Sequence, residues 1–276
     1  MGFTAPNVNG YANDGNPQIG DIVFDTSVNS FYGNTGSSWV LLGPGSGSGS
    51  YHAPTVQKFT SSGTYTPPSS PAPLYIVVEA IGAGGGGGGS WDGGDTPSPG
   101  SGGAGGNTTF GSIITAGGGA AGQAALYQVS TPGSAGGTNT VSGTATTVLN
   151  IQGGFSQGSF ATTTTEVGYV GSWGGGNTLF PTNGATSGWT ATSSPGVGSS
   201  GLANSGQGGA SGAESHFGNA TGTGGGGGGY VKAMIASPSS QTVTIGSGGT
   251  AGTAGGEGFA GGAGGSGLVI VTEYYQ

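Results

Sequence analysis

Glycine accounts for 71 of the 276 residues, and it is gathered into ordered tracts. Residues 84–89 and residues 224–229 are unbroken runs of glycine. From Gly246 to Gly267 every third residue is glycine, and the register holds over 22 residues. A flexible linker needs only a glycine-rich composition, whereas a helix with three residues per turn needs this period. Because a face without side chains lets backbones approach closely, we interpret these glycines as structural.

Three conformations of the tracts compete. Disordered spacers fit the composition but not the period of three. A collagen-like triple helix fits the period, but it relies on proline at roughly 15–20% of positions, and residues 246–267 contain none. In polyglycine II, the favoured interpretation, left-handed three-residue helices pack side by side and satisfy one another's outward-pointing backbone groups. The glycines expected to hold such a bundle together are Gly84, Gly87, Gly224, Gly227, Gly249, Gly252, Gly255, Gly258, Gly261 and Gly264.

Charged residues are scarce and mostly acidic. Lys58 and Lys232 are the only basic residues against ten acidic ones, which gives a net charge of −8. Two lysines cannot neutralise a run of phosphates, so nucleic acids and anionic membrane surfaces are poor partners. No apolar segment approaches the ~20 residues that a membrane-spanning helix needs. Cysteine is absent, which excludes disulfides and cysteine-based zinc sites.

Short strand-like segments lie towards both ends of the chain. Residues 19–25, 29–32 and 38–42 are separated by turn residues and predict a small antiparallel β-meander within residues 1–44. A piece this short is marginal alone, so we expect it to oligomerise or to dock onto a larger assembly. A Gly/Ser linker follows in residues 45–55. Further strands are predicted at residues 56–60, 63–67, 74–81, 108–115, 146–152, 230–236, 241–245 and 267–274.

The predicted fold class is all-β with essentially no α-helix, because no amphipathic helical period extends beyond a turn or two. Residues 56–276 are expected to form one glycine-rich domain. Strands from its two ends would build a β-sandwich, and the middle would project from the sandwich as an inserted polyglycine II helix bundle with loops. The N-terminal β-meander would form a separate module.

Aromatic side chains in the glycine-rich middle are candidate receptor-binding residues. They fall in Gly/Ser/Thr/Asn segments without strand periodicity, so the rings either fill a small core beneath the loops or stand exposed. Exposed aromatic rings on a rigid frame mark binding sites, and rings among short hydroxyl and amide side chains resemble antibody paratopes. With two neighbouring carboxylates, the candidates are Trp91, Asp92, Asp95, Phe155, Phe160, Tyr169, Trp173, Phe180 and Trp189.

Catalytic chemistry has little support in the residues. His52 and His216 are the only histidines, and a Ser/His/acid combination arises by chance in a serine-rich chain. Asp92 and Asp95 could form a glycosidase-like pair, but a turn with solvated carboxylates is the favoured interpretation. Two carboxylates also fall short of the six to eight oxygens that calcium takes. We therefore expect no enzyme activity, no cofactor and no metal.

An ordered succession of motifs carries a resemblance to a known family. KFTSSGTYT at 58–66 and YIVVEAIGA at 75–83 precede the first polyglycine run, and YVKA at 230–233, TVTIG at 242–246 and GGSGLVIVT at 264–272 close the chain. Over residues 56–276 this order resembles the glycine-rich domains of tailed-bacteriophage tail fibres. Residues 19–40 resemble short β-modules of phage fibre proteins. The interior is similar to the distal adhesins of T-even-type phages, where polyglycine II helices form a bundle and loops at its tip contact the host.

The resemblance implies a structural virion protein, a tail-fibre tip component that acts as a host receptor-binding adhesin. Residues 1–44 would join other virion fibre proteins, and the assembly would be a homotrimer, as fibres of this kind usually are. Loops around residues 90–99 and 153–195 would touch a host cell-surface glycan or an outer-membrane protein.

Three other functions stay open on the sequence. The chain could be a purely structural fibre or capsid-decoration protein. It could be an ice-binding protein, because polyglycine II bundles with flat, threonine-rich faces could order water. It could also be a polysaccharide depolymerase, for which Asp92, Asp95 and Glu166 are loose candidates.

Overall fold

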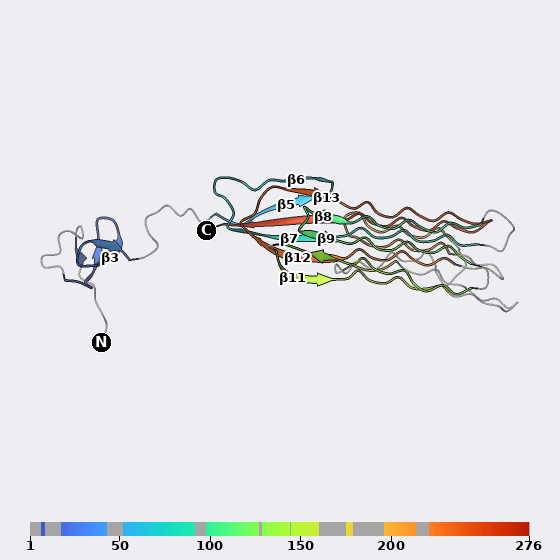
Figure 1. Cartoon of the computed structure of the whole chain (residues 1–276), viewed down its shortest axis with the longest axis horizontal. Helices are drawn as coiled ribbons and strands as arrows, with labels where there is room; N and C mark the ends of the chain where they lie inside the picture. The colour runs from blue at the N-terminus through green and yellow to red at the C-terminus, as the bar shows by residue number, and fades with distance from the viewer. Residues whose placement is uncertain are drawn as a thin grey trace. The chain divides into compact units, whose positions relative to one another are not determined.

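A computed structural model describes residues 7–8, 18–42, 52–91, 98–126, 129–143, 145–159, 175–178, 196–213 and 221–275. These residues form strands, turns and extended tracts without α-helix, which confirms the all-β class. The chain divides into two compact units, residues 1–52 and residues 53–275 (Figure 1). Most of the predicted linker lies outside the described residues. No helix in the described part of the chain is long and apolar enough to cross a membrane.

The N-terminal unit contains one four-stranded sheet in the order β1 (Asn7–Val8), β2 (Ile22–Asp25), β3 (Ser30–Asn34) and β4 (Trp39–Leu41). The three longer strands form the expected antiparallel meander, with Asn29 in the left-handed region of the turn between β2 and β3. In addition, β1 pairs in parallel with β2. The sequence did not predict β1, because two residues carry no strand periodicity.

The glycine-rich unit contains two five-stranded sheets, in the orders β11-β12-β7-β14-β5 and β10-β9-β8-β13-β6. The strand β7 lies at the centre of the first sheet and pairs antiparallel with β12 and with β14. The bounds are β5 (Thr55–Phe59), β6 (Gly63–Tyr65), β7 (Tyr75–Ile81), β8 (Thr108–Phe110), β9 (Ile114–Ala116), β10 (Thr140–Val141), β11 (Ala145–Ile151), β12 (Tyr230–Ala236), β13 (Gln241–Thr244) and β14 (Leu268–Tyr274).

Both sheets contain strands from the middle of the glycine-rich unit as well as from its ends. Residues 108–115 were expected to form one strand, but they form the hairpin of β8 and β9. The reversal occurs at Gly111, whose φ of 54° lies in the left-handed region that glycine adopts readily. The strand β11 joins the first sheet beside β12. The two ends of the domain therefore do not build the sheets alone.

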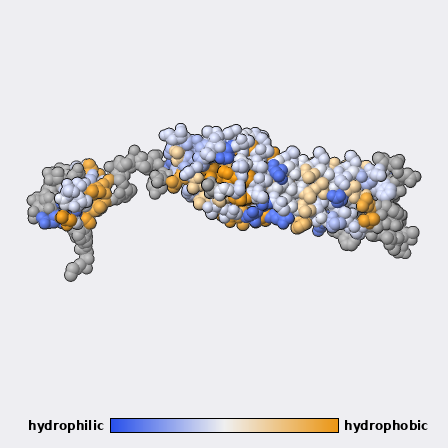
Figure 2. Space-filling view, in the orientation of Figure 1, coloured by the Kyte–Doolittle hydropathy of each residue, from blue (hydrophilic) through white to orange (hydrophobic). Residues whose placement is uncertain are grey.

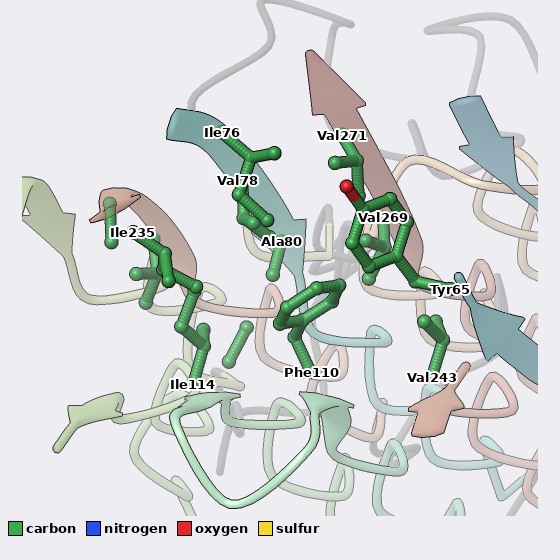
Figure 3. Close-up of a cluster of buried hydrophobic side chains, with 13 residues drawn as sticks. Tyr65, Ile76, Val78, Ala80, Phe110, Ile114, Ile235, Val243, Val269 and Val271 are labelled. Carbon is green, nitrogen blue, oxygen red and sulfur yellow. The ribbon is translucent and has the colours of Figure 1, made fainter. Parts of the chain in front are cut away.

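One hydrophobic core joins the two sheets in a sandwich-like arrangement (Figure 3). In β7 the residues Ile76, Val78 and Ala80 are buried at alternate positions, as a strand with one face on a core requires. The rings of Tyr65 and Phe110, which come from the second sheet, lie 5.5 Å apart. The buried members are Tyr65, Ile76, Val78, Ala80, Phe110, Ile114, Ala116, Val231, Ala233, Ile235, Val243, Val269 and Val271.

A buried carboxylate ties the edge strand β5 and the strand β6 to β14. Glu273 is 2% exposed. Its Oε1 accepts hydrogen bonds from Gln57 Nε2 and from the Tyr65 hydroxyl, both at 3.0 Å. Its Oε2 accepts from Thr55 Oγ1 and from the Tyr275 hydroxyl. Burial and the hydrogen bond to Glu273 raise the pKa of the Tyr65 phenol above its ordinary value, so Tyr65 stays protonated and keeps donating.

Candidate binding site at the distal end of the glycine tracts

The tract that follows β7, residues 82–90, is the centre of the glycine-rich structure. Every backbone N–H from Gly82 to Ser90 donates a hydrogen bond to another segment, with N···O distances of 2.8–3.1 Å. The acceptor segment repeats every third residue. The N–H groups of residues 84, 87 and 90 donate to the carbonyls of 265, 262 and 259. Those of residues 82, 85 and 88 donate to 229, 226 and 223, and those of residues 83, 86 and 89 donate to 106, 103 and 100. Each of the three neighbouring tracts therefore runs antiparallel to the central one.

The carbonyl groups of the central tract follow the same period. Gly249, Gly252 and Gly255 donate their N–H groups to the carbonyls of Gly84, Gly87 and Ser90. Residues 119, 122 and 125 donate to 83, 86 and 89, and residues 209 and 212 donate to 85 and 88. These three tracts run parallel to the central one. A strand directs its backbone groups to two opposite sides, whereas the central tract directs them to neighbours on all sides.

Close backbone approach explains why these positions are glycine. A Cβ added at Gly84, or at any other position of the run 84–89, would lie less than 3.0 Å from a backbone carbonyl of a neighbouring tract. The same holds for Gly227, Gly249, Gly252, Gly258, Gly261 and Gly264, while Gly224 and Gly255 are buried. Because glycine recurs every third residue in 246–267, these glycines lie on the sides of the tract that contact other tracts. Figure 1 shows the tracts running side by side away from the sheets.

The central tract ends at Ser90, away from the sheets. Its side chain is fully buried, and its Oγ accepts a hydrogen bond from the Phe259 N–H at 2.8 Å. The Ser90 N–H donates to the Phe259 carbonyl at 2.9 Å, and the Gly255 N–H donates to the Ser90 carbonyl at 3.0 Å. These bonds tie the central tract to the reversal between residues 255 and 259. The next residue, Trp91, is consequently fixed at the distal end, where it forms a bridge with Gly255.

A shallow pocket of about 150 Å³ lies beside Trp91. Its wall combines the ends of three tracts, because Ala125 pairs with Gly89 of the central tract and residues 98–100 begin the returning one. Leu126 is 52% exposed at its rim, and Val129, which bridges to Leu126, is 49% exposed. The lining residues are Trp91, Ser98, Pro99, Ala124, Ala125 and Leu126. The lining that the described residues contribute is therefore apolar and uncharged, with one hydroxyl side chain.

Phe155 lies elsewhere on the glycine-rich unit. It is 67% exposed, and the neighbouring Gly154 accepts a hydrogen bond from the N–H of Gly227. The residue before Gly227, Gly226, accepts a hydrogen bond from the N–H of Gly85. Phe155 therefore lies beside the half of the central tract that is nearer to the sheets. The structure therefore does not bring Phe155 together with Trp91. The remaining candidates lie outside the described residues: Asp92, Asp95, Phe160, Tyr169, Trp173, Phe180 and Trp189.

The sequence reasoning missed the aliphatic part of the pocket. Leu126, in the pocket wall, and Val129, which bridges to it, are aliphatic, whereas the predicted site residues were aromatic or acidic. A usable signal was present, since residues 124–129, with the sequence AALYQV, interrupt the Gly/Ser texture with large side chains. Pro99 was likewise predicted only as part of a loop.

Neither lysine lies in the wall of this pocket, whereas Glu257 belongs to the reversal whose Gly255 bridges to Trp91. The Lys232 ammonium contacts the Glu79 carboxylate at 3.1 Å, between the paired strands β12 and β7. Lys58 belongs to the edge strand β5. The described residues contain no group of three or more His, Cys, Asp or Glu side chains that could hold a metal ion. The pocket can therefore offer apolar contact and hydrogen bonds, but neither lysine is placed to pair with an anion there.

The chain was compared with protein-family models, with curated proteins and with solved structures, and none of them matches it.

Proposed function

We propose that the chain is a structural virion protein, a tail-fibre tip component whose glycine-rich unit displays a host receptor-binding site at its distal end. The observation that supports this proposal is the Trp91 pocket at the end of a densely hydrogen-bonded backbone frame. A patch that combines the half-buried ring of Trp91 with the exposed Leu126 on a rigid frame is a typical binding surface. The virion location itself is inferred from the order of motifs in residues 56–276.

The tracts, in this proposal, adopt the polyglycine II conformation. Their hydrogen-bond partners repeat every third residue, which fits a helix of three residues per turn. At roughly 3.1 Å per residue, the stretch from Gly82 to Ser90 would carry the chain on the order of 25 Å beyond β7. The many backbone hydrogen bonds offset the ordering entropy that glycine loses on folding. The bundle is thus a stiff mount that needs neither cysteine nor a large side-chain core.

The ligand class favoured by the pocket is a neutral sugar ring of a cell-surface glycan. An engineered cavity of about 150 Å³ binds benzene, so the volume suits one six-membered ring. The indole face carries negative charge density, which attracts the polarised C–H groups of a pyranose. The Ser98 hydroxyl can hydrogen-bond to a sugar hydroxyl. An acidic sugar is disfavoured, because neither lysine lies in the pocket wall.

Replacing Trp91 with alanine should weaken binding to host cells by about ten-fold or more, because buried tryptophan anchors dominate interfaces. Purified, fluorescently labelled protein would be titrated onto intact bacteria, including strains stripped of capsule or lacking single outer-membrane proteins. Val148→Ser, which changes a 57% exposed residue on the sheet edge strand β11, serves as the matched control. Phe155→Ala tests whether the receptor binds the side of the glycine tracts instead of their distal end.

The outcomes separate the candidates cleanly. A folded Trp91→Ala protein that binds as well as the unmodified chain would contradict the assignment of the pocket. Binding lost only with Phe155→Ala would move the receptor site to the flank. A folded chain that binds no strain at all would exclude the adhesin role and favour the purely structural fibre or capsid-decoration function.

A further inference from the structure

The register of the N-terminal sheet collects apolar side chains on one face. In paired strands, directly opposite residues point to the same side. Phe24 lies opposite Phe31, Ile22 lies opposite Gly33, and Gly33 lies opposite Val40 on its other side. The Leu42 N–H donates to the Phe31 carbonyl, which continues the same row. We call this set the apolar face: Ile22, Phe24, Phe31, Gly33, Val40 and Leu42.

Side-chain contacts agree with this register. The rings of Phe24 and Phe31 lie 4.9 Å apart. A Cβ at Gly33 would meet the Leu42 Cδ1 at 2.9 Å, so the Leu42 side chain covers Gly33 on this face. These six residues carry no polar or charged side chain, and the register continues the row on the far side of Phe24 to Asn7 in β1. The opposite face holds Tyr32, Asn34, the buried Asp25 and the fully buried Val23, together with Trp39 and Leu41.

The apolar face stays largely open in the structure. Phe31 is 47%, Val40 is 48% and Leu42 is 42% exposed, and Figure 2 shows hydrophobic atoms gathered on the surface of this unit. Contiguous exposed apolar surface of this kind marks an interaction site. A unit of 52 residues is also marginal on its own, and small domains are usually stabilised by disulfides, metals or oligomerisation. Cysteine is absent from the chain, and the described residues contain no metal-ligand cluster.

We propose that the apolar face is the interface through which copies of this chain associate, apolar face against apolar face. Association with a partner is a common source of stability for a unit of this size. A face without charge gives a charged partner nothing to complement, whereas surfaces buried between identical subunits are more apolar than other interfaces. Phe31, an exposed aromatic near the middle of the face, is its natural anchor. This inference does not depend on receptor binding at the distal end.

The association is tested on the full chain, whose single-chain mass is 25.9 kDa. Sedimentation across a concentration series should give a multiple of that mass. Phe31→Ser and Val40→Lys should each raise the dissociation constant by about ten-fold or more. Val28→Ser, which removes an equally exposed apolar side chain (54%) from the turn outside the face, should leave the mass unchanged. Circular dichroism reports whether each variant keeps its strands.

Cross-linking gives a second measurement that places no charged or hydroxyl side chain on the apolar face. Because the chain contains no cysteine, a single Val40→Cys or Val28→Cys substitution provides a unique thiol. A short bis-maleimide should join Val40→Cys chains to one another efficiently and Val28→Cys chains poorly. A chain that is monomeric at all concentrations would overturn the proposal, including the case in which another part of the same chain covers the face. So would an oligomer that neither Phe31→Ser nor Val40→Lys weakens and in which both thiols cross-link alike.

Discussion

Replacing Gly87 with alanine is expected to lower the free energy of unfolding of the glycine-rich unit by about 3 kcal/mol or more. The added Cβ would lie less than 3.0 Å from the carbonyl of Ala210 and from the N atom of Ser211. These are backbone atoms that cannot rotate away as a side chain could. The tract would have to shift. The hydrogen bond that the Gly87 N–H donates to the Gly262 carbonyl, and the one that the Gly87 carbonyl accepts from the Gly252 N–H, would lengthen or break. Each buried backbone group left unpaired costs about 1–3 kcal/mol.

The matched control for this substitution is Gly196→Ala. A Cβ at Gly196 would meet no atom within 4 Å, so stability should change by no more than about 0.5 kcal/mol. Both variants would be unfolded in denaturant and followed by circular dichroism and tryptophan fluorescence. Equal stability of the Gly87→Ala protein and the unmodified chain would show that neighbouring tracts do not pack against Gly87 as described.

Replacing Glu273 with leucine is expected to destabilise the glycine-rich unit by about 3 kcal/mol. The carboxylate is buried and accepts hydrogen bonds from the side chains of Thr55, Gln57, Tyr65 and Tyr275. Leucine removes the acceptor for all of these donors, and hydrogen bonds to charged groups are worth about 1.5–3 kcal/mol each. Part of the loss is recovered because the buried charge is removed as well. Thermal and denaturant unfolding of the full chain measure the difference.

Two further variants separate the charge of Glu273 from its shape. Glu273→Gln keeps the shape but places an amide group, itself a donor, against donors, so an intermediate loss of about 1–2 kcal/mol is expected. Glu257→Gln makes the same change at an exposed carboxylate in a turn and should cost clearly less than Glu273→Gln. If Glu273→Leu is as stable as the unmodified chain, the buried carboxylate does not hold β5 and β6 against β14.

Local sequence signals predicted the longer strands well. β12 has the predicted bounds, and β14 and β7 agree with theirs to within a residue. These strands are rich in β-branched residues and alternate between buried and half-buried positions, so pattern and packing point the same way. The hairpin at Gly111 was missed because one glycine within a strand-like run gives no local sign of reversal. The parallel strand β1 was missed because two residues carry too little pattern.

The partners of the glycine tracts were beyond prediction from the sequence. The period of three predicted that Gly249 and Gly252 face other backbones, and the structure places them so. It could not say which tract lies against which, because glycine has no side chain to encode a partner. The same limit applies to the candidate site. Trp91 and Phe155 lie in similar sequence texture, and only the hydrogen-bond register puts one at the distal end and the other on the flank.

The most direct test of the account is the hydrogen-exchange rate of the backbone amides from Gly82 to Ser90, measured residue by residue in the full chain by NMR. Every one of these N–H groups donates a hydrogen bond inside the structure, so the account predicts continuous protection along the whole tract. A strand at a sheet edge would protect alternate amides instead, and a disordered spacer would protect none. Either of these patterns in residues 84–89 would contradict the hydrogen-bonded frame on which the proposed site stands.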